Sequence, residues 1–120
     1  MKTLIATTLG FVLLAAGAAR ADSNKIDLMP GGLVCDKKDQ VCYDQRGANV
    51  AETRKMFGEY AASSVQKRLG KHEGWGTKKF TLSNGVKCSV PNRSCRKEGG
   101  EGERARKVQK HLFSAPPPLA

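Results

Sequence analysis

The 120-residue sequence predicts a small α+β domain in which two disulfide-clamped β-hairpins pack on one main helix, with a short C-terminal helix after them. Three observations predict this class. Two cysteine pairs, Cys35 with Cys42 and Cys88 with Cys95, each enclose six residues. One long pattern of helical periodicity separates the two pairs, and a shorter basic pattern follows the second. The segments between these features are short and rich in turn residues, as expected for an α+β domain.

The first 21 residues have the organisation of a secretory signal peptide. Lys2 precedes an uncharged apolar run over 4–19, and residues 19–21 form an A-x-A cleavage signal. The run is shorter than the roughly 20 apolar residues that a membrane span needs. We therefore expect cleavage before Asp22, a periplasmic or secreted bacterial protein, and no transmembrane segment after cleavage.

Cleavage leaves 99 residues, enough for one small domain. Without Lys2 and Arg20, 19 basic residues stand against 11 acidic ones, so the net charge is +8. Aromatic residues are few, and a chain with such a thin core usually needs a covalent or metal staple. We expect an N-terminal linker over 22–31, a single disulfide-stapled domain over 32–113, and a Pro-rich disordered tail over 114–120.

The four cysteines are interpreted as two disulfides, because an even number of cysteines in a small exported chain is normally oxidised. Of the three possible connectivities, the spacing favours the local one. With Cys35 opposite Cys42, the pairs 36/41 and 37/40 fall into register around a Lys38-Asp39 turn, and Pro91-Asn92 takes the same place in the second pair. Each eight-residue loop then gains roughly 2.5 kcal/mol from its bridge. A zinc site is the alternative, although its paired cysteines usually lie two to four residues apart.

The two halves of the chain share an outline. A shift of 53 residues matches both cysteine pairs, matches Gly32 with Gly85 and Gly47 with Gly100, and places Leu33 over Val86. Either an internal duplication of a hairpin and a helix or the same hairpin arrangement reached twice would give this pattern. The sequence leaves both explanations open.

Residues 50–69 predict the main helix. Asn49 stands before it as an N-cap, and Glu52 three residues on resembles the acidic member of a capping box. Gly70 is expected to end the helix. Gly58 costs about 1 kcal/mol relative to alanine inside a helix, so a break into two short helices is the alternative. The apolar face is expected to hold Met56, Phe57, Tyr60, Ala61, Val65 and Leu69.

The second half carries strand and helix patterns of its own. The segment KKFTLSNGVKC predicts a strand, an Asn-Gly turn and a second strand, with Phe80 and Leu82 on one face. The hairpin of the second cysteine pair brings the total there to three short strands. After KEGGEGE, a short basic helix is predicted by the spacing of Ala105, Val108, Leu112 and Phe113.

Four successive blocks of sequence run from Gly32 to Phe113: GLVCDKKDQVCYDQRG, MFGEYAASSVQKRL, FTLSNGVKCSVPNRSCR and KHLF. Together they resemble the Fels prophage protein-like family, a YcgJ-like group of small exported bacterial proteins of unknown function. The recurring marks of that family fall here on Cys35-Asp36, Cys42 with Asp44, Phe57-Gly58, Asn84-Gly85 with Cys88, and Cys95-Arg96.

The chain departs from the pattern of this family in two places. At Ser89 the resemblance implies an acidic residue, and after Arg96 the segment KEGGEGE replaces an Asp-Arg-aromatic stretch. If the family has a site at these positions, the resemblance implies that this member has lost it. The resemblance supports an exported domain and leaves its activity open.

Among the possible functions, catalysis has less support in the sequence than binding. Paired cysteines cannot act as nucleophiles, and no serine lies in a Gly-x-Ser-x-Gly elbow. His72 beside Glu73 is the candidate proton shuttle of a small hydrolytic or acid-base enzyme, but such a pair is more often a solvated loop. His111 is interpreted as a solvated partner of the helix dipole rather than a general base. We predict no catalytic residue, no metal ligand and no cofactor.

The basic residues predict a binding surface for an anionic partner. The candidate surface comprises Trp75, Lys71, Lys78, Lys79, Arg93, Arg96 and Lys97. Basic surfaces concentrate anionic partners, which for an exported protein are envelope lipids, glycans or acidic proteins, whereas nucleic acid is not expected there. Two alternatives are that Trp75 fills the core and that the charge serves solubility alone. The predicted function is a non-enzymatic binding module, and an envelope-stress or prophage-host interaction factor is a further alternative.

Overall fold

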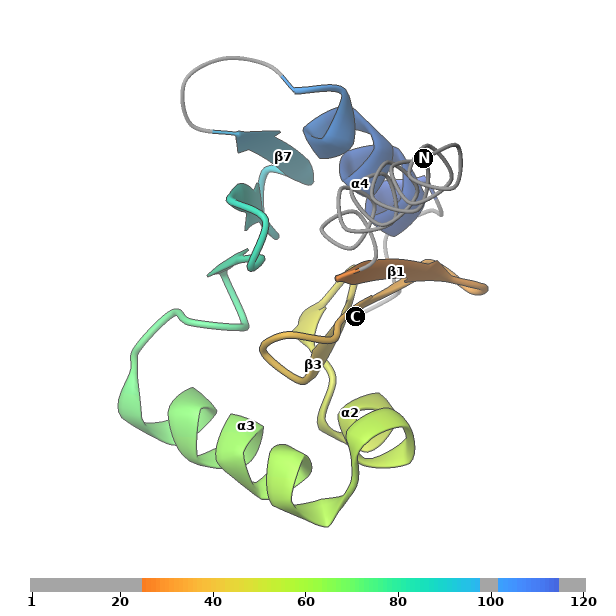
Figure 1. The fold of residues 1–120 in the computed structure, drawn as a ribbon. Helices are drawn as coiled ribbons and strands as arrows, with labels where there is room; N and C mark the ends of the chain where they lie inside the picture. Colours follow the sequence, from red (N-terminus) through yellow and green to blue (C-terminus); the bar gives the residue numbers. More distant parts are fainter. Residues whose placement is uncertain (1–24, 98–101, 115–120) are drawn as a thin grey trace, which may run out of the picture.

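The computed structural model describes residues 25–97 and 102–114. The predicted signal peptide, the segment 98–101 and the tail beyond Ser114 lie outside these ranges. Within them the chain forms a four-stranded antiparallel sheet, a three-stranded antiparallel sheet and helices on both sides of the second sheet in sequence (Figure 1). The predicted α+β class is confirmed.

The first sheet has the order β1 (Ile26–Met29), β2 (Leu33–Asp36), β3 (Val41–Asp44) and β4 (Gly47–Ala48). Cys35 pairs with Cys42 and Asp36 with Val41, as the spacing predicts. The turn is wider than the two residues predicted, because Gln40 adopts a φ of 58° and its N–H donates to the Asp36 carbonyl instead of joining the ladder.

Strand β1 forms within the segment 22–31, for which the sequence predicts a linker. Three of its four residues are apolar, and Ile26 packs against the core while the backbone pairs with β2. A strand this short has little sequence signal of its own, because it is stabilised by the neighbour with which it pairs.

The second sheet has the order β5 (Lys79–Thr81), β6 (Val86–Ser89) and β7 (Ser94–Lys97), which confirms the three predicted strands. Gly85, with a φ of 94°, closes the turn between β5 and β6, where the Val86 N–H donates to the Asn84 side chain. Between β6 and β7, the Arg93 N–H donates to the Val90 carbonyl, so Pro91-Asn92 forms the centre of the turn as predicted.

The main helix is two helices, α2 (Val50–Phe57) and α3 (Glu59–Lys71), which meet at Gly58. Gly58 has φ 98° and ψ 177°, a conformation outside the helical region that glycine adopts readily. The prediction of one uninterrupted helix is therefore wrong, and the alternative with a break at Gly58 is confirmed. At the start of α2, Asn49 is the N-cap, and its side chain accepts a hydrogen bond from the Glu52 N–H.

The break changes which side chains of the predicted apolar face are buried. Ala61 and Val65 lie in the interior, but Tyr60 is 87% exposed and Met56 is 40% exposed. For Tyr60, which follows the break, the apolar face predicted for one continuous helix is misaligned, because the second helix starts in a new direction. The short basic helix α4 (Glu103–Phe113) shows no such error: the four residues that predict it are all buried.

A shift of 53 residues carries β1 onto β5, β2 onto β6, β3 onto β7 and the start of α2 onto the start of α4. The strand registers agree as well, since Asp27 lies opposite Cys35 just as Phe80 lies opposite Cys88. The only non-glycine residues with positive φ in the described ranges, Gln40 and Arg93, are also 53 positions apart. The fold therefore uses one unit of three strands and a helix twice, here called repeat 1 (26–57) and repeat 2 (79–113), with α3 between them. Repeat 1 has the two-residue β4 before its helix, and the equivalent positions 100–101 lie outside the described residues.

The hydrophobic core lies between the two repeats. Tyr43 of β3 stacks on Phe80 of β5 with ring centroids 4.0 Å apart and planes 11° from parallel. Helix α4 contacts β2 of repeat 1 as well as β6 and β7 of its own repeat (Figure 1). The loop before β5 is held by the Ala48 N–H, which donates to the Gly76 carbonyl. A Cβ on Gly47 would lie 1.6 Å from that carbonyl oxygen, so this approach requires glycine.

Candidate functional site

The two faces of the second sheet differ sharply in composition. Phe80, Val86, Cys88 and Cys95 are buried against the core. Side chains alternate between the faces of a strand, so the residues between these lie on the opposite face. The ladder places Lys79, Ser89 and Ser94 in one row across that face and Thr81, Lys87 and Arg96 in the next. These six residues, here called the basic face, are all lysine, arginine, serine or threonine.

A hollow of about 420 Å³ opens at the basic face and is here called the face hollow. Asn92 and Pro91 of the β6–β7 turn and Lys78 before β5 extend its wall. No carboxylate occurs among the described residues that line it, whereas four cations do: Lys78, Lys79, Lys87 and Arg96. The structure thus brings together three residues of the predicted surface, and it adds Lys87, which the sequence analysis missed.

Backbone hydrogen bonds fix the position of these side chains. The N–H groups of Lys78 and Lys79 both donate to the Gly74 carbonyl, which folds the loop tightly before β5. The Val90 N–H donates to the Lys78 carbonyl at 2.8 Å, so the β6–β7 turn is tied to that loop. Across the turn, the Asn92 N–H donates to the Ser89 hydroxyl. The wall of the face hollow is therefore held by main-chain contacts on both sides.

Trp75 and Lys71 belong to the predicted surface but do not line the face hollow. Trp75 is half-buried and packs against the hydrophobic core. The Arg68 guanidinium lies 3.8 Å from the centre of its ring, a cation–π arrangement that covers the indole. The indole is thus covered on one side by the core and on the other by an arginine.

Arg93 lies at the tip of the β6–β7 hairpin with a φ of 50°. Its guanidinium donates to the Phe113 carbonyl at 2.7 Å and to the Gln45 side chain at 3.1 Å. It lines a second hollow of about 400 Å³, here called the α4 hollow, together with Arg106, Gln109, Lys110, Phe113 and Ser114. Lys97 lines neither of the two hollows, because it follows Arg96 in β7 and is directed to the other face.

In both repeats a helix side chain binds the backbone N–H of the second cysteine. Thr53 of α2 accepts the bond from Cys42 at 2.9 Å, and Gln109 of α4 accepts the bond from Cys95 at 2.8 Å. Each bond supplies an acceptor for a backbone N–H at the edge of β3 or β7 that faces away from the rest of its hairpin. In repeat 2 the bond also fixes how α4 lies along β7, and so where the α4 hollow forms.

Both disulfides are formed as predicted, Cys35 with Cys42 and Cys88 with Cys95. The cysteines are therefore not available as zinc ligands, and the zinc alternative is wrong. In the described ranges, no three His, Cys, Asp or Glu side chains converge in a way that could hold a metal ion. No helix within those ranges is long and apolar enough to cross a membrane.

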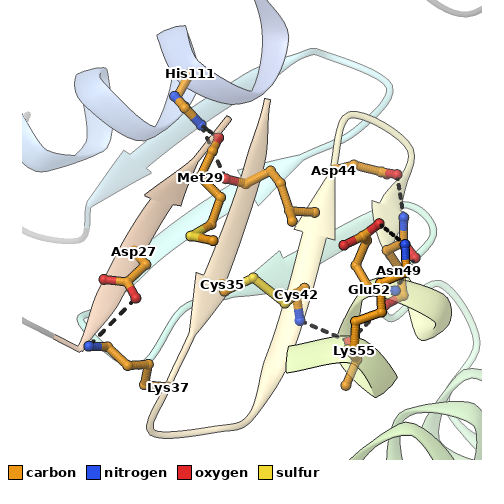
Figure 2. Close-up of a disulfide and its surroundings, with 12 residues drawn as sticks. Asp27, Met29, Cys35, Lys37, Cys42, Asp44, Asn49, Glu52, Lys55 and His111 are labelled. Atoms are coloured by element: carbon orange, nitrogen blue, oxygen red, sulfur yellow. Dashed lines mark hydrogen bonds and ion pairs between the residues drawn. A yellow bond between two sulfur atoms is a disulfide. The ribbon is translucent and has the colours of Figure 1, made fainter. Parts of the chain in front are cut away.

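The family marks near the first disulfide have structural partners (Figure 2). The Asp44 carboxylate accepts a hydrogen bond from the Asn49 side chain and so supports the N-cap of α2. Asp36 is fully buried, and its carboxylate accepts from the N–H groups of Lys38 and Asp39 in its own turn. It also accepts from the N–H and the hydroxyl of Ser83, both at 2.7 Å. Asp36 therefore connects repeat 1 to the β5–β6 turn of repeat 2.

The two histidines lie in different surroundings. The Nε2 atom of His111 contacts the carbonyl oxygens of Met29 and Leu33, so this nitrogen must carry the proton and donate it (Figure 2). The interpretation of His111 as a solvated residue is wrong, because it clamps α4 to the β1–β2 turn. His72 and Glu73 are exposed in the loop after α3, and within the described residues neither side chain has a hydrogen-bond partner.

A narrower crevice of about 220 Å³ lies between the β2–β3 turn and α3, lined by Asp39, Tyr60, Ser64 and Arg68 among others. Burial and the nearby Asp36 carboxylate raise the pKa of Asp39, while Arg68 and Lys38 oppose the shift. Burial, with a contribution from Asp36, also raises the pKa of Tyr43 above its ordinary value, so the phenol stays neutral in the core.

Comparison with known proteins adds the family. The model of the YcgJ protein family matches residues 26–113, from the first residue of β1 to the last of α4. The chain belongs to the YcgJ family. It is 30% identical over 100 residues to the uncharacterized protein YcgJ of Escherichia coli strain K12, covering 81% of this chain and 77% of that relative. No solved structure matches significantly. The predicted YcgJ-like resemblance is confirmed, and the match spans both repeats completely.

Proposed function

We propose that the protein is an exported, non-enzymatic binding module for an anionic component of the bacterial envelope, and that the basic face of repeat 2 is its site. The observation that supports this most is the face hollow, in which four cations and two serine hydroxyl groups meet without a carboxylate among the described lining residues. Two disulfides are typical of proteins from oxidising compartments, which supports the exported location.

The residues that line the face hollow favour a ligand that carries a phosphate, sulfate or carboxylate group. Lysines act as point charges, while the planar guanidinium of Arg96 can donate two parallel hydrogen bonds to one oxyanion. Serine hydroxyls and the Asn92 amide are neutral donors of the kind that fix the orientation of such groups. A hollow of about 420 Å³ has the size of a small-molecule site, but its charge selects against an apolar ligand.

Ser89 is central to this proposal. The equivalent position in repeat 1 is Asp36, and the resemblance to the family implies an acidic residue at 89 as well. A carboxylate there would face Lys79 across the ladder and would repel an anion in the hollow. Serine is uncharged, so it does not offset the positive charge of the four cations.

Catalysis has less support in the geometry. His72 and Glu73 are exposed and lie outside the residues that line the face hollow. General acid-base catalysis needs a group held within hydrogen-bond reach of the reacting atom, usually with a second group that orients it. Binding is therefore the function that we propose, with His72→Ala and Glu73→Ala as variants that should leave it unchanged.

The proposal is tested by titrating the purified protein with a sulfated disaccharide and with tripolyphosphate at low ionic strength, using calorimetry. The double variant Lys79→Gln/Arg96→Gln should bind both at least about tenfold more weakly, because it removes one point charge and one bidentate donor. The single variant Ser89→Asp should weaken binding in the same direction.

The matched control is Lys38→Gln/Lys67→Gln, which removes the same net charge from exposed positions in the β2–β3 turn and in α3. It should bind as the unmodified protein does. Equal losses in the control and in the Lys79→Gln/Arg96→Gln variant would show attraction to net charge alone and would overturn the proposed site. Unchanged binding in the Lys79→Gln/Arg96→Gln variant would overturn it as well. A preference for the disaccharide or for tripolyphosphate would identify the anionic group.

A further inference from the structure

The face hollow and the α4 hollow meet at the tip of the β6–β7 hairpin. Asn92 and Ser94 line the face hollow, and Arg93 between them lines the α4 hollow. Successive residues of a hairpin are directed to opposite sides, so the tip forms a ridge with one hollow on each side.

The α4 hollow is basic and structurally fixed. Arg106 and Lys110 are four residues apart on α4, so their side chains are neighbours on one side of the helix. Arg93 is held against this side by its bond to the Phe113 carbonyl and by the Phe113 ring, 5.4 Å from its guanidinium carbon. Gln109 is bonded to the Cys95 N–H and anchors the helix. As in the face hollow, the described lining residues include no carboxylate.

We infer that the two hollows are subsites for one linear anionic glycan, whose charged groups bind on both sides of the β6–β7 ridge. This inference rests on the proposed function and extends it from a single anionic group to a chain of such groups. A small anion occupies one hollow at a time, whereas a polymer with repeated sulfate, phosphate or uronate groups reaches both. Binding at the first subsite then raises the effective concentration of the ligand at the second.

The distribution of apolar residues favours a glycan over a nucleic acid or a membrane surface. Among the described residues, the large apolar side chains that are exposed are Leu28, Met56 and Tyr60, and none of them lines either hollow. Proteins that bind single-stranded nucleic acid use aromatic platforms for the bases, and proteins that lie on bilayers insert apolar side chains. Phe113, the aromatic residue of the α4 hollow, is 9% exposed and packs under Arg93.

The inference predicts that affinity depends on ligand length. Heparin-derived oligosaccharides from disaccharide to octasaccharide serve as probes, and calorimetry with the purified protein gives each dissociation constant. The octasaccharide should bind at least about tenfold more tightly than the disaccharide after correction for the number of equivalent positions along the chain. The variant Arg106→Gln/Lys110→Gln should lose this gain and keep the disaccharide affinity. The variant Lys79→Gln/Arg96→Gln should weaken both.

The outcomes separate this inference from the proposed function. Disaccharide binding that depends on Lys79 and Arg96 but does not strengthen with length would overturn the two-subsite inference and leave the proposed function standing. Equal weakening by Arg106→Gln/Lys110→Gln and by the Lys38→Gln/Lys67→Gln control would also overturn it. If single-stranded DNA of equal charge, or vesicles of anionic phospholipid, bound as tightly as the octasaccharide, the assignment to a glycan would be wrong.

Discussion

The two repeats have the same strand register, but opposite faces of their hairpins join the shared core, and only repeat 1 is buried on both faces. In repeat 1, Val34 and Tyr43 are buried at 0% and 1% exposure and help to form the core. The equivalent residues of repeat 2 are Lys87 and Arg96, which are exposed on the basic face. The hairpin, its disulfide and its pairing are therefore independent of which face joins the core. Since repeat 1 supplies this face to the interior, the same face of repeat 2 is available for charge.

One position shows the difference most directly. Asp36 ends β2 with a buried carboxylate that accepts four hydrogen bonds, two of them from Ser83 in repeat 2. Ser89 ends β6 and lines the face hollow, where its hydroxyl accepts one bond from the turn. Repeat 1 uses this position to hold the two halves together. Repeat 2 uses it at a site that is open to solvent.

The largest expected effect is that of Asp36→Ala. Removing this buried carboxylate leaves the partly buried N–H and hydroxyl groups of Ser83 without their acceptor, which should lower the free energy of unfolding by about 3 kcal/mol. The equivalent change Ser89→Ala should cost less than about 0.5 kcal/mol, as surface substitutions do. Urea unfolding followed by circular dichroism measures both. Equal losses would contradict the view that the two positions have different roles.

The losses of stability on removing either disulfide should differ less between the two repeats. In each double variant, Cys35→Ala/Cys42→Ala or Cys88→Ala/Cys95→Ala, the lost constraint on an eight-residue loop is worth about 2.5 kcal/mol. All four cysteines are buried, Cys35 and Cys42 at 0% exposure and Cys88 and Cys95 at 3% and 8%, so both variants also lose packing, and their losses should agree within about 1 kcal/mol. Thermal unfolding of the two variants measures both losses, and a larger difference would show that one repeat holds the better-packed clamp.

The smallest expected effect is that of Asp39→Asn, which gives the turn of repeat 1 the residue found at position 92 in repeat 2. Because burial raises the pKa of Asp39 in the folded chain, the unfolded chain loses this proton first as the pH rises above 3.8, and folding is penalised from there upward. Asparagine carries no such penalty. The variant should thus be more stable than the unmodified protein at neutral pH, by at most about 0.5 kcal/mol because Asp39 is largely exposed. The difference should vanish well below pH 3.8. A gain of equal size at low pH would assign the effect to something other than ionisation.

Local patterns predicted much of the fold. The spacing of the cysteines predicts the pairing across both hairpins, the capping pattern predicts the start of α2, and the spacing of apolar residues predicts the buried side of α4. Each of these depends on residues that are close in the chain. Strand β1 was not predicted, because a four-residue strand depends on its neighbour. The break at Gly58 was predicted only as the alternative, because a glycine is compatible with both helix and break.

The candidate site was predicted in part. Lys78, Lys79 and Arg96 were named from their charge, and Lys87 was detectable because it alternates with Cys88 as Lys79 does with Phe80. The α4 hollow could not be predicted in this way, because Arg93 and Lys110 meet only when the hairpin tip packs on a helix that follows it in the chain. The role of His111 depends on a contact between residues 82 positions apart, for which a single sequence offers no signal.

Each disulfide closes within its own hairpin, so no disulfide joins one repeat to the other. During oxidation, a thiol that is seven residues from its native partner meets it far more often than it meets either cysteine of the other hairpin. Closing an eight-residue loop is favoured by roughly 1.6 kcal/mol over closing the 47-residue loop between Cys42 and Cys88, the shortest of the mispaired loops. The chain therefore favours its native pairs before the core has formed, and its oxidation should require little help from a disulfide isomerase.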